Sequence, residues 1–268
     1  MKDDLSTRMK ENYENRTRFF LPRRSYTLIR VDGKAFHTYT KGLQRPFDMG
    51  LIDDMDQTAI HLCKNIMGAQ FAFVQSDEIS IVITDFKDIS TQAWFDNNLQ
   101  KMCSISASLA TAKFNQLRMV RQFILEDIDA RTKAHVGYLE DMNLTLAMFD
   151  SRVWQIPDRT EVENYFIWRQ QDTVRNSIFS VAQSLYSHKE LHKKNGNEMQ
   201  EMIFQKGINW NDYSPNLKRG RIIVKESYTV LGMGVDGSVS TRNKWVVQGA
   251  PDFTKEREWF NEFLPKQV

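Results

Sequence analysis

The sequence has little cysteine. It contains two, Cys63 and Cys103, among 268 residues, and neither has a second cysteine at the spacing of a metal-ligand pair. Each falls in a helical pattern where a small buried residue would serve. These observations argue against a zinc site and against a disulfide scaffold, and they fit a reducing compartment.

Long apolar runs and a charge excess are also missing. No run of about 18 apolar residues could span a bilayer, and the start, MKDDLSTRMK, lacks the apolar region of a signal peptide. The 36 basic and 34 acidic residues leave a formal charge of +2, so a nucleic-acid surface would have to be a local patch. We expect a cytoplasmic protein with no membrane partner.

The chain has enough apolar residues for a substantial core, since they make up 41% of the composition. No internal repeat, low-complexity tract or linker divides it, and the length suits one large or two small domains. We therefore expect a single elaborated domain over residues 1–268, with a palm-like core at about 20–157 and a C-terminal extension at about 158–268.

The core shows a regular order of predicted elements. Alternation in SYTLIRVDGKAF predicts a strand that enters a turn at Gly33, and FAFVQ and ISIVIT predict two more strands. Helical spacing covers 51–67 and, later, 94–112. The segment 144–157 reads as a strand with a bulge near Asp150. The order β-α-β-β-α-β is ferredoxin-like, an α+β fold whose antiparallel sheet carries helices on one face.

The extension begins after Pro157, where Asp158 and Glu161 resemble a helix capping box. A short helix over 197–206, a strand in KRGRIIVKE, and then a glycine-rich hairpin and a terminal helix are expected. GMGVDG fits the G-x-G-x-x-G pattern, but β-like sequence follows it, so we interpret it as a turn rather than a dinucleotide site. The segment 117–141 has mixed signals and stays unassigned.

Two adjacent carboxylates stand at the tip of the predicted hairpin in FVQSDEISIVI. In this fold order Asp77 can lie beside Asp32, at the end of the first strand. Two carboxylates with a glycine carbonyl make a hard-oxygen site of the kind that binds Mg²⁺, and Gly33 would let a triphosphate approach closely. Arg30 and Lys34 could neutralise phosphate charge. The same residues also suit ordinary turns, and the pattern alone favours that plainer interpretation.

Several motifs together resemble the tRNA-His guanylyltransferase superfamily, which adds nucleotides in the 3′-to-5′ direction. They are RVDGKAFHTYTKGLQRPFD, QSDEISIVI, FDSRVWQIP, WRQQD, and INWND before KRGRIIVK. The resemblance runs from about residue 30 to about residue 225. It implies a polymerase-like palm with two Mg²⁺ ions. Asp32 and Asp77 would be metal ligands, Gly33 would offer its carbonyl, and Glu78 would be a supporting catalytic carboxylate.

The resemblance also implies nucleotide contacts. Within RPFD, Arg45 would bind a phosphate and Asp48 the base. Lys101 matches a lysine that approaches phosphate, although a solvated helix position is equally plausible. His37 suits a structural role at least as well as a catalytic one. The full set expected beside the nucleotide is Arg30, Gly33, Lys34, Ala35, Phe36, His37, Arg45, Asp48, Ser76 and Lys101.

One motif departs from the eukaryotic enzymes, which carry D-C-H-I-N-N where this chain has DTVRNS. Val174 replaces the histidine, so recognition of the tRNA-His anticodon is in doubt. The departure points to the guanylyltransferase-like branch of bacteria and archaea, which resembles a templated end-repair polymerase. Arg169, Asp172 and Asn176 recur at i, i+3 and i+7 and form either a solvated face or a tRNA-binding stripe.

We therefore predict a nucleotidyltransferase that extends the 5′ end of tRNA, with ATP and GTP or another nucleoside triphosphate as substrates. Family resemblance alone implies a homotetramer. A tRNA-His-specific guanylyltransferase is the first alternative. A palm-type nucleotide cyclase and a non-catalytic RNA-binding protein are the others, and intact Asp32, Gly33 and Asp77 speak against the last.

Overall fold

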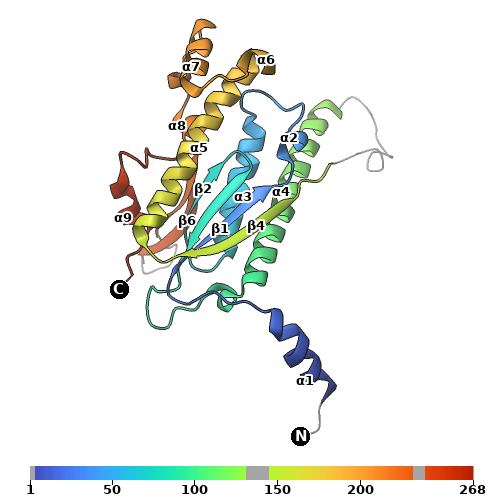
Figure 1. The fold of residues 1–268 in the computed structure, drawn as a ribbon, viewed down its shortest axis with the longest axis vertical. Helices are drawn as coiled ribbons and strands as arrows, with labels where there is room; N and C mark the ends of the chain where they lie inside the picture. Colours follow the sequence, from blue (N-terminus) through green and yellow to red (C-terminus); the bar gives the residue numbers. More distant parts are fainter. Residues whose placement is uncertain (1–3, 131–144, 232–238, 268) are drawn as a thin grey trace.

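The computed structural model describes residues 4–130, 145–231 and 239–267. Its centre is a six-stranded antiparallel sheet with the order β4-β1-β3-β2-β5-β6 (Figure 1). The first four strands along the chain have the predicted ferredoxin-like order, which is confirmed. The strands are β1 (Tyr26–Gly33), β2 (Ala69–Gln75), β3 (Glu78–Ile83), β4 (Phe149–Ile156), β5 (Arg221–Leu231) and β6 (Val239–Gly249).

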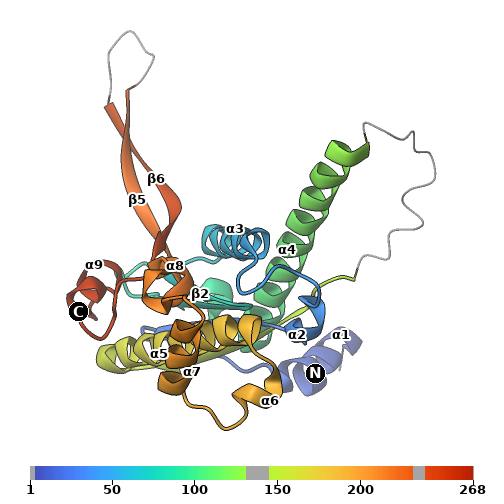
Figure 2. The same cartoon turned by 90° about the horizontal axis from the view of Figure 1, so that it is seen from above.

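Both faces of the sheet are covered, because its central strands are apolar on both sides. Ile29 and Val31 of β1 face one core, which α3 (Met49–Asn65) and α4 (Leu99–Ala130) complete. Tyr26 and Leu28 face a second core against α5 (Arg159–Leu185). Figure 2 shows α3 and α4 on one side of the sheet and α5 on the other. The extension thus supplies the helix that buries the second face.

Shorter helices complete the described ranges. They are α1 (Leu5–Met9), α2 (Phe36–Tyr39), α6 (His188–Leu191), α7 (Gly196–Gln205), α8 (Pro215–Lys218) and α9 (Phe260–Phe263), with a π turn at Lys10–Glu14 and 3₁₀ turns at Asn15–Thr17, Trp94–Asn97, Trp210–Asp212 and Arg257–Trp259. A third apolar cluster joins α5 to α7. Among the described helices, none has both the length and the hydropathy to cross a bilayer.

Three details differ from the sequence-based expectations. No bulge occurs at Asp150, because β4 pairs with β1 residue by residue along its whole length. The register shift lies instead in β2, between Ala69 and Phe71. Asp158 caps α5 by accepting the Glu161 N–H at 3.0 Å, but the Glu161 side chain accepts from Asn164, so only half of the capping box forms.

The structure shows part of the unassigned segment 117–141 and part of the expected C-terminal hairpin. α4 continues to Ala130, so the first part of the unassigned segment is helix, and its remainder lies outside the described residues. β5 and β6 form the expected C-terminal hairpin and extend the sheet at β2. The turn expected at GMGVDG lies outside the described residues.

Candidate active site

Four carboxyl side chains lie near one edge of the sheet, where β1 ends and where β3 and β4 begin. Asp32 pairs with Glu78 of β3 on one side and with Asp150 of β4 on the other. Asp77 lies in the two-residue turn between β2 and β3, and its carbonyl oxygen accepts the Gly33 N–H at 3.1 Å. The strand end and the hairpin tip therefore lie side by side, as the sequence analysis expected of Asp32 and Asp77.

Burial perturbs both of these carboxylates. It is the largest cause that raises the pKa of Asp32, and the negative charge of Glu78 adds to it while Arg30 opposes it. Burial also raises the pKa of Asp77. Hydrogen bonds from its own N–H and from the Ser76 hydroxyl oppose the rise, and the charges of Asp32 and Glu78 add to it. A cation bound between the two groups would act in the opposite direction and lower both pKa values.

The donor set fits a divalent cation of the hard type. Among the described residues, no group of three or more His, Cys, Asp or Glu side chains is arranged to hold a metal. Two carboxylates and nearby main-chain carbonyls remain, and Mg²⁺ typically takes one or two carboxylates and completes its shell with phosphate oxygens and water. Asp32 and Asp77 therefore suit Mg²⁺ better than a closed structural metal site.

Glu78 is held by α5 rather than left free for a ligand. The Arg169 guanidinium donates to both of its carboxylate oxygens, at 2.9 and 2.8 Å, and the Ser80 hydroxyl donates to Oε1 at 3.1 Å. The Tyr165 hydroxyl lies 2.8 Å from that of Ser80, and burial is the largest cause that raises the pKa of Tyr165 to about 12. This buried network holds β3 against α5 next to Asp77. Glu78 therefore stabilises the position of the turn that carries Asp77.

The structure places Arg169, one of the three residues of the polar stripe expected on α5, between Glu78 and Asp172. Its side chain is 8% exposed and donates to Asp172 as well as to Glu78, which leaves little of it accessible to RNA. Asp172 also accepts from Arg175. Asn176 is exposed and borders a pocket described below. Of the three predicted RNA contacts, Asn176 is the most accessible.

Gly33 is required by packing. A Cβ atom there would stand 2.2 Å from a ring carbon of Phe36, which is 5% exposed and packs against Phe114 and Phe149. Close approach of a triphosphate is therefore not needed to explain the glycine. The Phe36 side chain is committed to the core, so a nucleotide could meet only the main chain of this residue.

The other residues of this loop face solvent. Lys34, Ala35 and His37 are exposed, and Ala35 has a left-handed φ of 53°. The Nε atom of Arg30 is buried without a hydrogen-bond partner in the described structure. Arg30 and Lys34 thus offer positive charge on the two sides of Asp32, and the exposed His37 lies outside the core.

Arg45 and Asp48 lie in the segment that leads into α3. Arg45 is exposed. Asp48 caps the helix, because its Oδ1 accepts the Leu51 N–H at 2.7 Å and its Oδ2 accepts the Gln44 N–H at 3.2 Å. If Asp48 also bound a base, its carboxylate oxygens would have to accept from the base and from these main-chain N–H groups at the same time.

The structure does not bring Lys101 to this site within one chain. The Phe149 N–H donates to the Thr111 hydroxyl at 3.2 Å, and Phe149 pairs with Gly33, so Thr111 is level with the site. Lys101 stands ten residues earlier on α4, about 15 Å along the helix axis. Its ammonium lies over the Phe95 ring instead. The structure therefore places Lys101 away from the carboxylates of its own chain, and the phosphate contact stays a prediction.

The sequence analysis missed the partners that surround these carboxylates. Asp150 reaches the site through the antiparallel register of β4, and Ser80 and Tyr165 reach it through the packing of α5. Arg221 was noted only as part of a basic entry to a strand, yet it is 4% exposed. Side-chain alternation in β3 places Ser80 on the same face as Glu78, which is the one signal that the sequence contained.

Comparison with known proteins identifies the fold and family. Residues 6–157 match the family described as tRNAHis guanylyltransferase (Thg1). A bacterial tRNA(His) guanylyltransferase (Thg1)-like protein in complex with ATP is 42% identical, with a TM-score of 0.81 over 98% of this chain and 99% of that chain. A bacterial structure of the same description, in complex with GTP, is 40% identical, with a TM-score of 0.75 over 97% of this chain and 99% of that chain.

A more distant relative agrees. The tRNA(His) guanylyltransferase of Saccharomyces cerevisiae is 26% identical over 216 residues, which are 75% of this chain and 83% of the yeast protein. The family match covers more than half of the chain and the structural likeness covers nearly all of it. With its paired strand-end carboxylates, this chain belongs to the tRNA-His guanylyltransferase family and is a nucleotidyltransferase.

Proposed function

We propose that this nucleotidyltransferase adds nucleotides to the 5′ end of tRNA in the 3′-to-5′ direction. The observation that carries the proposal is the position of Asp32 and Asp77 at neighbouring strand ends, half-buried and outside any salt bridge of the described residues. A carboxylate pair of this kind has no role in packing, and it suits two cations that serve phosphoryl transfer. The related bacterial structures carry ATP and GTP, which supports nucleoside triphosphates as substrates.

The acidic residues of the site would bind metal ions, and the basic residues would bind phosphate. Two Mg²⁺ ions, when bound, would activate the 3′-hydroxyl of the incoming nucleotide and neutralise charge on its triphosphate. Asp32, Asp77 and the Gly33 carbonyl would hold them. Arg30 and Lys34 would bind triphosphate oxygens, since both present positive charge beside the carboxylates.

Neighbouring groups would orient the nucleotide. Ser76 and the main chain at Ala35 and Phe36 would donate to its phosphates, and the exposed Arg45 would reach the outer one. Asp48 would border the base. His37, exposed beside this loop, would approach the triphosphate rather than exchange a proton with it. The 5′ end of the RNA would enter already activated, as a triphosphate or by adenylylation.

Template-directed repair of 5′-truncated tRNA is favoured over selection of tRNA-His by its anticodon. Val174 stands where the eukaryotic enzymes carry a histidine, and here it packs against the cluster between α5 and α7. An apolar residue in that place offers no hydrogen bond to a base. Pairing with the opposite strand of the acceptor stem would then set the identity of the added nucleotide. The names of the relatives keep a tRNA-His-specific enzyme as the second candidate.

The test is a 5′-extension assay. Purified protein is incubated with tRNA transcripts that lack the first nucleotide and carry C, G, A or U opposite the gap, with Mg²⁺, ATP and each labelled nucleoside triphosphate. Watson–Crick addition across several tRNA species is expected, and the Asp77→Ala variant should add nothing. Addition of G to tRNA-His alone, whatever lies opposite, would support the second candidate. No extension of any transcript would refute both, and turnover of nucleotide without RNA would indicate a cyclase.

The oligomer is part of the same proposal. A homotetramer, as the family resemblance implied, would let one subunit bind the acceptor end while another binds the rest of the tRNA. Light scattering of the purified protein measures its mass directly, and a monomer at assay concentration would exclude this arrangement.

A further inference from the structure

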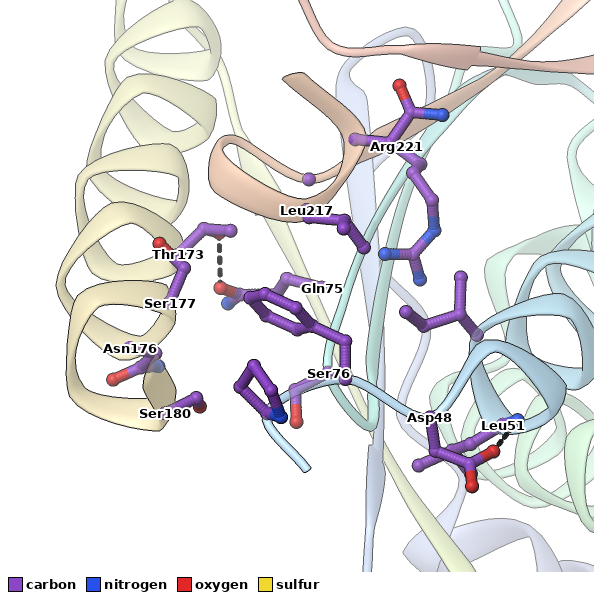
Figure 3. Close-up of a pocket in the computed structure, with 15 residues that line it drawn as sticks. Asp48, Leu51, Gln75, Ser76, Thr173, Asn176, Ser177, Ser180, Leu217 and Arg221 are labelled. Atoms are coloured by element: carbon purple, nitrogen blue, oxygen red, sulfur yellow. Dashed lines mark hydrogen bonds between the residues drawn. The ribbon is translucent and has the colours of Figure 1, made fainter. Parts of the chain in front are cut away.

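A pocket opens next to the candidate active site, between the start of α3, the middle of α5, the end of β2 and the start of β5 (Figure 3). Its volume is about 150 Å³. An apolar cavity of about this size holds one benzene ring. Ser76 lines the pocket and directly precedes Asp77, so a ligand there would lie beside the carboxylate pair.

The pocket contains an arginine with a free donor. Arg221 is 4% exposed, and its Nε donates to Asp56 Oδ1 at 2.5 Å. Its Nη2 atom is buried, and no hydrogen-bond partner for it exists in the described part of the chain. In Figure 3 the guanidinium extends from β5 toward the side of the pocket that Leu217 lines. A buried donor without a partner is costly, and an acceptor on a ligand would satisfy it.

The charge balance argues against an anionic ligand. Asp56 is buried at 6% exposure and offsets the charge of Arg221. Asp48 adds a further carboxylate to the pocket wall. A phosphate or carboxylate would therefore meet a cation already paired with Asp56 and a second carboxylate in the pocket wall, which favours a neutral acceptor.

The remaining walls suit a flat ring. Phe47, Leu51, Ile52 and Leu217 give the pocket apolar sides, and amide and hydroxyl groups of β2 and α5 border the rest. Phe47 is itself fixed by an edge contact with Tyr213, 5.5 Å between centroids. Apolar walls with a few placed polar groups are typical of sites for small planar ligands, and a nucleobase combines a flat apolar face with edge acceptors.

We infer that this pocket binds the six-membered ring of a guanine or uracil base, with Arg221 Nη2 donating to the ring carbonyl oxygen. Adenine would present an amino group at the same edge and leave the Arg221 donor unpaired. The base could belong to a free nucleotide or to an RNA end, since both carry the same edge. The inference rests on the proposed function for the class of ligand, and it adds Arg221 as the residue that discriminates between bases.

The test measures binding without turnover, by calorimetry in the absence of Mg²⁺. One arm compares GTP, inosine triphosphate, which keeps the carbonyl, and 2-aminopurine riboside triphosphate, which lacks it. GTP and inosine triphosphate should bind alike, and the aminopurine about tenfold more weakly, because a buried charged donor loses its acceptor. A second arm compares acceptor-stem hairpins with an unpaired terminal G or A, and it distinguishes an RNA base from a free nucleotide.

Two variants remove the donor in different ways. Arg221→Lys keeps a cation for Asp56 but loses the Nη2 atom. The double variant Asp56→Leu with Arg221→Met replaces the whole buried pair by apolar side chains, a change that proteins often tolerate. Both should abolish the preference for a carbonyl-bearing base. Lys225→Gln, which removes an exposed charge from the same strand, is the matched control and should keep the preference.

The outcomes separate this inference from the proposed function. A preference for guanine in either arm that both donor variants abolish supports the inference, even if no 5′ extension occurs. Equal binding of all bases by the unmodified protein in both arms overturns it, and so does a preference that survives in a folded donor variant. In those cases a positive extension assay would leave the proposed function standing.

Discussion

Replacing Arg169 by methionine distinguishes a structural role for this side chain from a role in RNA binding. Methionine keeps the length of the side chain and removes the guanidinium. Glu78 would then be a buried carboxylate with no cation beside it, since the side chains of Arg169 and Glu78 are only 8% and 9% exposed. Removing one partner of a buried ion pair costs about 3–5 kcal/mol of the free energy of unfolding.

We expect Arg169→Met to lose about 3 kcal/mol of the free energy of unfolding. For a chain of this size that corresponds to a fall in melting temperature of roughly 6–12 °C. The lower end of the range applies because the Ser80 hydroxyl still donates to Glu78. Urea denaturation followed by tryptophan fluorescence measures the change. Adding Glu78→Gln removes the uncompensated charge and should restore more than half of the loss.

The matched control is Arg175→Met. Arg175 pairs with Asp172 as Arg169 does, but its side chain is 71% exposed, so the change should alter the free energy of unfolding by less than about 0.5 kcal/mol. The reasoning would be refuted if Arg169→Met kept the stability of the unmodified protein and lost only RNA affinity in a filter-binding assay. That result would restore the RNA-contact interpretation.

Three further outcomes are expected. Because burial raises the pKa of Asp77, its ionisation lowers the stability of the metal-free fold as pH rises above about 4. Asp77→Asn should therefore melt at a higher temperature than the unmodified protein at pH 7 in EDTA, but not at pH 3. A lower melting temperature of the variant at pH 7 would contradict this. Gly33→Ala should cost about 1–3 kcal/mol in urea denaturation, because its Cβ would meet the Phe36 ring at 2.2 Å, and an unchanged midpoint would disprove that packing. Arg45→Ala should raise the KM for nucleotide more than it lowers kcat. Lys101→Ala should leave the KM for nucleotide unchanged, because Lys101 lies away from the carboxylates. Equal increases in KM for the two variants would contradict this position of Lys101.

Local pattern was a sound guide where an element is long and periodic. Alternation in β1 separates Ile29 and Val31 from Tyr26 and Leu28, and the structure buries the two pairs in different cores. Local pattern failed at details that depend on partners. The half-formed capping box at Glu161 is one example, because the Glu161 side chain accepts from Asn164 and not from the main chain of Asp158.

The sequence by itself determined the order of strands and helices, and that order brings Asp32 beside the turn that carries Asp77. Period-two and period-3.6 patterns are local, and the ferredoxin-like order follows from them with few alternatives. The motifs likewise indicated the family. These properties need only the spacing of residues along the chain.

Only the tertiary structure decided what each charged side chain faces. Arg169 lies on a helix face that pattern describes as polar, yet the packing of α5 on the sheet buries it against Glu78. Lys101 and Arg221 are both basic residues near predicted element starts, but one faces solvent about 15 Å along the helix from the level of the site and the other is buried beside a pocket. Charge and spacing are the same in both states, and burial depends on contacts between segments far apart in the sequence.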